Sequence, residues 1–119
     1  MLTKEEALKA YELICLSFLG EEAPVDAKEV FEALKYYSQT DKNFFMPLGN
    51  MYLNGTGTSP NVFKALSCYK AFEDYNYIVY YLENEEPDEE MKATLESWVY
   101  EGSQKNDMIC LNYLKRHKK

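Results

Sequence analysis

The chain has 119 residues, which is enough for one compact hydrophobic core and too few for two domains of ordinary size. Its net charge is −7, and because the last five residues carry four positive side chains, the part before them carries −11. So acidic a surface repels phosphate backbones, which argues against nucleic acid as a direct partner.

Two features of the sequence indicate a cytoplasmic protein. No apolar run approaches the roughly 20 residues that a membrane span requires, and residues 1–6 begin an amphipathic helix in place of an apolar signal core. Cys15, Cys68 and Cys110 are odd in number, widely spaced and set among apolar neighbours. We therefore expect three buried thiols in a reducing compartment, with disulfide bonding as the alternative.

A first pair of helices is predicted for residues 4–39. Thr3 and Glu6 have the spacing of a capping box at its start, and Gly20 is expected to end the first helix. Asp26, three residues before another glutamate, repeats the capping signal for the second helix. The apolar stripes at helical spacing are Ala7, Tyr11, Ile14 and Phe18, then Ala27, Val30, Phe31, Leu34 and Tyr37.

The second predicted pair, residues 43–74, carries the most specific pattern in the chain. A small Gly49 near a large Tyr52 lets a neighbouring helix approach while the ring fills the space beside it. Gly55 and Gly57 supply the positive φ angles that end the first helix of this pair. The face of its second helix consists of Val62, Ala65, Leu66, Tyr69 and Phe72.

The starts of these two helices differ in clarity. The second has a clear signal in residues 59–61, where Ser59 or Asn61 can cap the amide groups and a proline fits the first turn. In the first, Pro47 falls where continuous helix is expected. The helix therefore either starts late, near Met46, or is kinked, with Asp41 or Asn43 capping a preceding turn.

The segment from Leu48 to Phe72 resembles the SEL-like repeat, a relative of the tetratricopeptide repeat. The family pattern runs L-G-x-x-Y-x-x-G-x-G, then D-x-x-K-A, then W/Y and a small residue; Asn61 here stands where the pattern has the aspartate. The resemblance implies stacked antiparallel helix pairs, a short right-handed α-α superhelix and a protein-binding scaffold without catalytic activity. It covers about a fifth of the chain, and the paired cysteines of secreted family members are missing.

A third, degenerate pair is predicted for residues 77–101. Its first helix is short, from Tyr77 to Leu82, and its loop lacks glycine. Lys92 and Ala93 stand in the place that lysine and alanine occupy in the central pair, and Trp98 is expected in the core. A final helix over residues 107–117 would cap the open end of the stack, so we expect one all-α domain over residues 1–119.

An acidic cluster surrounds Pro87. It consists of Glu83, Glu85, Glu86, Asp88, Glu89 and Glu90. In the structural interpretation, the cluster is a solvated loop whose acidic side chains stabilise the N-terminus of the next helix. The functional one is a docking patch for a basic protein surface, where charges steer association. A divalent-cation site is a minor alternative, because the spacing fits no calcium loop.

Aromatic residues are the other candidates for partner binding. Eleven tyrosines, six phenylalanines and one tryptophan exceed what a core of this size readily holds. Adjacent rings cannot both face the core, so some tyrosines must reach the surface. They either pack at half-buried edges or anchor an interface. The candidate anchors are Tyr36, Tyr75, Tyr77, Tyr80 and Tyr81.

The sequence offers no recognisable catalytic or metal-binding set. The single histidine, His117, lies in a basic terminal segment, and a phosphate-binding loop is absent. We therefore predict no catalytic, cofactor or metal site. The leading hypothesis is a protein-interaction module of SEL-like type that binds another protein, with the oligomeric state open. Alternatives are a small acidic inhibitor of immunity-protein or antitoxin type, which would neutralise a basic toxin or nuclease, and an unrecognised catalytic domain.

Overall fold

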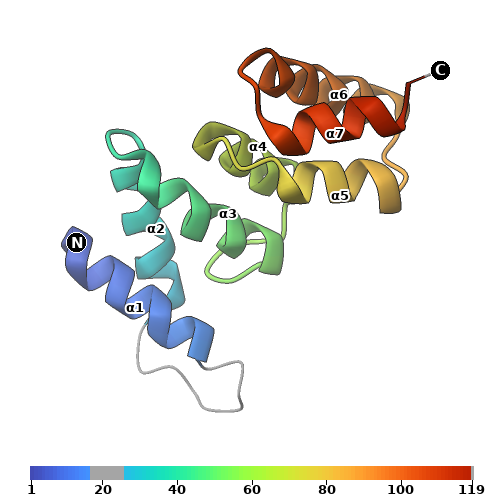
Figure 1. Cartoon of the computed structure of the whole chain (residues 1–119). Helices are drawn as coiled ribbons and strands as arrows, with labels where there is room; N and C mark the ends of the chain where they lie inside the picture. Colours follow the sequence, from blue (N-terminus) through green and yellow to red (C-terminus); the bar gives the residue numbers. More distant parts are fainter. Residues whose placement is uncertain (17–25, 119) are drawn as a thin grey trace. The chain divides into compact units, whose positions relative to one another are not determined.

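A computed structural model describes residues 1–16 and 26–118 of the chain. Over these residues the fold is all-helical and without strands (Figure 1). The expectations for Phe18 and Gly20 lie outside the described residues. The helices are α1 (Lys4–Leu16), α2 (Ala27–Ser38), η2 (Lys42–Phe44), α3 (Phe45–Asn54), α4 (Val62–Phe72), α5 (Asn76–Asn84), α6 (Glu89–Gln104) and α7 (Met108–Arg116).

Contacts between residues divide the chain into two compact units, Met1–Cys68 and Tyr69–Lys119. The boundary falls inside α4, so this helix contributes residues to both units. Each unit has buried apolar residues of its own. The prediction of one domain over residues 1–119 stays a prediction.

In the first unit, α2 packs against both α1 and α3. The capping box at the start of α1 is confirmed, since the Glu6 amide donates to Thr3 Oγ1 at 3.1 Å and the Thr3 amide donates to Glu6 Oε1 at 2.9 Å. The Asp26 carboxylate accepts from the Lys28 amide at 3.0 Å, which caps α2. The buried apolar side chains of the helices α1, α2 and α3 include Ala7, Ala10, Ile14, Val30, Phe31, Ala33, Leu34, Leu48, Met51 and Tyr52.

The late start, one of the two alternatives expected for α3, is confirmed. Asp41 caps the short η2 helix by accepting from the Asn43 amide at 3.0 Å, and α3 begins at Phe45. Pro47 therefore lies in the first turn of α3, where its missing N–H leaves no helical hydrogen bond unmade.

The glycine loop between α3 and α4 also has the predicted geometry. Gly55 and Gly57 have φ angles of 69° and 74°. A Cβ at Gly57 would lie 2.4 Å from the Ala27 carbonyl oxygen, so both the backbone angle and the close approach to α2 require glycine. Asn61 then caps α4 by accepting from the Lys64 amide at 3.0 Å.

In the second unit, each of α5, α6 and α7 packs against the other two (Figure 1, yellow to red). Asp88 caps α6 and Asp107 caps α7, each accepting a backbone N–H through its side chain. Trp98, expected in the core, is only half-buried. The buried apolar side chains of the second unit include Tyr69, Tyr75, Ile78, Val79, Leu95, Val99, Cys110 and Tyr113.

The cysteine prediction was wrong in one position. Cys68 and Cys110 are buried, but Cys15 is exposed near the end of α1. All three are free thiols. Apolar neighbours in the sequence did not reveal that Cys15 itself is exposed.

Candidate functional site

Helix α5 gathers three tyrosines into one group, which we call the α5 tyrosine cluster: Tyr77, Tyr80 and Tyr81. Their spacing of three and four residues places them on neighbouring positions of the helix surface. The Tyr77 ring centroid lies 5.5 Å from that of Tyr80 and 6.4 Å from that of Tyr81. Tyr69, at the end of α4, adds an edge contact to Tyr77 at 5.9 Å.

The cluster is partly buried and lies in the field of a carboxylate. Burial raises the pKa of the Tyr77 phenol above its usual range, and the charge of Glu85 adds to the shift. Tyr80 remains 47% exposed and Tyr77 is half-buried. The rings are therefore held in place by one another while part of their surface remains accessible to a partner.

Two hollows meet at Tyr80. One, of about 480 Å3, is lined by Asn76, Tyr77 and Tyr80. The other, of about 260 Å3, lies between α5 and α7 and is lined by Asn76 and Tyr80 together with Glu83 and Arg116. One side of Tyr80 thus adjoins an aromatic surface, and the other adjoins an ion pair.

Glu83 occupies a different position from the one predicted. It belongs to α5, where its carboxylate accepts from Arg116 Nε and Nη2, both at 3.1 Å. His117 Nε2 lies 2.9 Å from the same carboxylate. The hydrogen bond with His117 and then that with Arg116 lower the pKa of Glu83. This acid is therefore paired with the chain's own basic segment, and its place among the partner-binding residues stays a prediction.

Three of the other acids support the structural interpretation of the cluster. The Asp88 carboxylate accepts from the Met91 amide at 2.8 Å, and Glu89 and Glu90 occupy the first turn of α6. Negative side chains at a helix N-terminus are stabilised by the helix dipole. Glu85 and Glu86 lie outside that turn, in the connection between α5 and α6.

Most of this acidic surface carries no compensating charge. Among residues 1–16 and 26–118, no ion pair is formed by Glu85, Glu86, Glu89 or Glu90, and all four are exposed. We call these four residues, which lie in the connection between α5 and α6 and in the first turn of α6, the loop acids. They follow the α5 tyrosine cluster directly along the chain. The negative charge of Glu85 contributes to the raised pKa of Tyr77.

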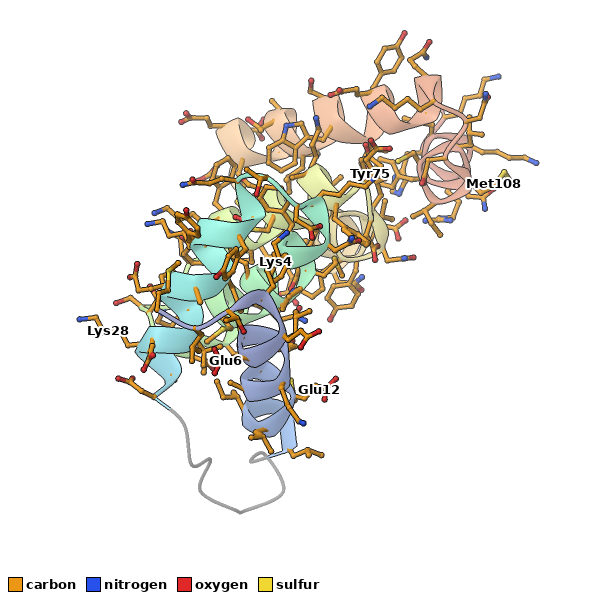
Figure 2. All side chains as sticks on the ribbon, turned by 90° about the vertical axis from the view of Figure 1, so that its left-hand side faces the viewer. Lys4, Glu6, Glu12, Lys28, Tyr75 and Met108 are labelled. Atoms are coloured by element: carbon orange, nitrogen blue, oxygen red, sulfur yellow. The ribbon has the colours of Figure 1, made fainter. Side chains whose placement is uncertain are left out.

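Tyr75 is not a surface anchor, and its assignment to the partner-binding set was wrong. Only 2% of the residue is exposed, and it lies among the helices of the second unit (Figure 2). Burial, with a contribution from Cys110, raises the pKa of Tyr75 to about 12. Tyr75 directly precedes α5, and its neighbours in the sequence gave no sign that the ring turns inward.

Tyr36 belongs to the first unit. It is 54% exposed on α2, and its ring makes an edge contact with Tyr37 at 5.2 Å. With Glu32, Lys35 and Gln39 it lines a hollow of about 190 Å3. Its exposure fits the prediction of a surface tyrosine, but it is not part of the α5 tyrosine cluster.

Asn76 and Arg116 line the hollows at Tyr80, and neither was predicted from the sequence. Asn76 lines both hollows, while its amide donates to the Asp74 carboxylate at 2.9 Å. The sequence identified Arg116 only as one of the positive side chains of the C-terminal segment. Its pairing with Glu83 joins positions 33 residues apart, for which no local signal exists.

No group of three or more histidine, cysteine, aspartate or glutamate side chains in the described part of the chain is placed to hold a metal ion. No helix formed by these residues has the length and apolar character needed to cross a bilayer.

Comparisons with protein-family models, with curated proteins and with solved structures returned no match to this chain.

Proposed function

We propose that this protein is a non-catalytic protein-interaction module of SEL-like helical-repeat type, acting in the cytoplasm, whose partner has a basic surface. Its helix pairs would stack in a short right-handed superhelix. The glycine loop between α3 and α4 supports the family assignment, because Gly55 and Gly57 adopt the positive φ angles that the repeat pattern implies. Tyr52, the aromatic of that pattern, is buried against Phe31 at a centroid distance of 5.1 Å.

One observation carries the proposal for the partner: four uncompensated loop acids directly follow a cluster of accessible tyrosines. Exposed carboxylates at the edge of an interface mainly raise the association rate and select partners of opposite charge. Tyrosine is among the residues that most often dominate the binding energy of protein interfaces. The two features together fit a basic protein segment better than they fit a small uncharged ligand.

The experiment is affinity capture from the native cell with the wild-type chain and a charge-reversed variant. The variant carries Glu85→Lys, Glu86→Lys, Glu89→Lys and Glu90→Lys. We expect the wild type to retain a basic protein that this variant loses. The melting temperature of the variant should fall only modestly, because lysines at positions 89 and 90 interact unfavourably with the N-terminus of α6 while the other exposed charges contribute little to stability. The captured protein is identified by mass spectrometry.

A matched control reverses four exposed acids of the first unit. Glu5, Glu12, Glu29 and Glu32 are suitable, because Glu5 and Glu29 lie in first helical turns as Glu89 and Glu90 do. Figure 2 shows Glu12 projecting from α1. If both variants lose the partner equally, net charge and not the proposed surface controls binding. If the loop-acid variant retains every protein that the wild type captures, the proposal is wrong.

A further inference from the structure

An arginine of the chain itself, Arg116, already lies beside the α5 tyrosine cluster. The Arg116 guanidinium donates two hydrogen bonds to Glu83 in the hollow that Tyr80 lines on its α7 side. A planar guanidinium that meets a carboxylate through two parallel hydrogen bonds is a specific and comparatively strong contact. The surroundings of Tyr80 are therefore compatible with a guanidinium group.

On the other side of Tyr80, the hollow of about 480 Å3 presents aromatic surface without a cation of its own. The cation–aromatic contacts found among the described residues involve Lys4 and Lys64, both in the first unit. No described cationic side chain lies over Tyr77 or Tyr80. Asn76 lines this hollow, and its side-chain carbonyl oxygen can accept a hydrogen bond, since the contact with Asp74 uses the amide nitrogen.

We infer that this hollow receives an arginine side chain of a protein partner, with the guanidinium stacked on Tyr80 and Tyr77 and its charge attracted by Glu85. The inference rests on the proposed function and names the side chain that the partner supplies. Among the loop acids, Glu85 is the one that caps the C-terminal end of α5, where its amide donates to the Tyr81 carbonyl at 3.0 Å, and its charge also raises the pKa of the Tyr77 phenol.

Arginine fits this surface better than lysine for physical reasons. A guanidinium is flat, is weakly hydrated and can stack on a ring while its N–H groups still reach an acceptor at the edge, here Asn76. A lysine ammonium is compact and strongly hydrated, so it loses more solvation when it leaves water for an aromatic face. A purely electrostatic acidic surface would not distinguish the two.

The test compares two blocked peptides of equal charge, one with four Gly-Arg repeats and one with four Gly-Lys repeats, titrated into the full-length protein by NMR. We expect the arginine peptide to bind about 3-fold more tightly, in the range of an exposed cation–π contact. Shifts should concentrate at Asn76, Tyr77, Tyr80 and Glu85. Tyr80→Leu should abolish the preference for arginine, whereas Tyr80→Phe, which keeps the ring, should retain it.

Tyr100 provides the matched control, because it is an exposed tyrosine of α6 in the same unit, at 59% exposure. Tyr100→Leu should leave the arginine preference unchanged. Equal affinity for the two peptides, or no binding of either at millimolar concentration, would overturn the arginine site. The proposed function is judged separately by the capture experiment, since a basic partner can bind the loop acids without an arginine on Tyr80.

Discussion

At the scale of single residues, the contact around Gly102 explains how α6, α7 and the start of α5 pack closely. A Cβ at this position would lie 2.5 Å from Cys110 Sγ and 2.8 Å from Tyr75 Cζ. The cysteine thiol and the tyrosine ring therefore occupy the space that a side chain at position 102 would need. Packing at this density leaves the Tyr75 hydroxyl buried without a hydrogen-bond partner among the described residues.

That hydroxyl leads to a stability prediction. A buried polar group without a partner costs about 1 to 3 kcal/mol, whereas an apolar isostere at the same place avoids this cost. Tyr75→Phe should therefore leave the free energy of unfolding unchanged or raise it by about 1 kcal/mol. Chemical denaturation measures the difference. A loss of more than about 1 kcal/mol would show that the hydroxyl makes a stabilising contact.

The buried thiols predict a loss of stability at high pH. Burial raises the pKa of Cys110 from 9.0 to about 12 and that of Cys68 to about 11. The folded state thus keeps these protons more tightly than the unfolded state does. The stabilising contribution of the two protonated thiols is fully present below about pH 9. It is lost as the pH rises through their folded-state pKa values.

The corresponding measurement is thermal unfolding of the wild type and Cys110→Ala between pH 8 and pH 10. The variant starts less stable because it loses buried volume, but its melting temperature should fall less steeply with pH. Phenols begin to titrate at about pH 10 in both proteins, so the comparison between them isolates the contribution of Cys110. Parallel pH profiles for the two proteins would exclude the contribution assigned to Cys110.

At the scale of elements, the helix boundaries follow from short-range signals. The capping box of Thr3 and Glu6, the cap of Asn61 and the position of Pro47 in a first turn each involve residues within one helical turn. Sequence spacing is sufficient to predict such contacts, because the backbone geometry of a turn is nearly fixed. The same reasoning predicted that the helix before Gly55 ends there.

Contacts between elements were not predictable in the same way. Helical periodicity indicates which face of a helix is apolar, but not which helix lies against it. The burial of Tyr75, the exposure of Cys15 and the pairing of Arg116 with Glu83 all depend on that choice. For the candidate site, the sequence therefore supplied the tyrosines and the acids of α5 and its following loop, but neither the inward turn of Tyr75 nor the arginine from α7.

Gly57 provides the test at this scale. Any side chain there would combine an unfavourable positive φ with a close contact to the Ala27 carbonyl in α2. Gly57→Ala should therefore lower the free energy of unfolding by about 2 kcal/mol. Asn54→Ala, at an exposed position of α3, should change it by less than about 0.5 kcal/mol. Similar values for the two variants would contradict the close approach of the loop to α2.

At the scale of the whole molecule, the distribution of charge matters more than the total of −7. The basic C-terminal segment places Arg116 and His117 on Glu83, yet the loop acids stay uncompensated. If the protein is a dedicated inhibitor, it should form a one-to-one complex whose association rate falls steeply with ionic strength. A scaffold should instead bind segments of several proteins more weakly.

The most direct test of the proposed interaction is hydrogen–deuterium exchange of the protein alone and in complex with its captured partner. Binding through the α5 tyrosine cluster and the loop acids predicts slower exchange over residues 76–92, because a partner would cover α5 and the start of α6. Slower exchange confined to α1 and α2, with residues 76–92 unchanged, would contradict the account.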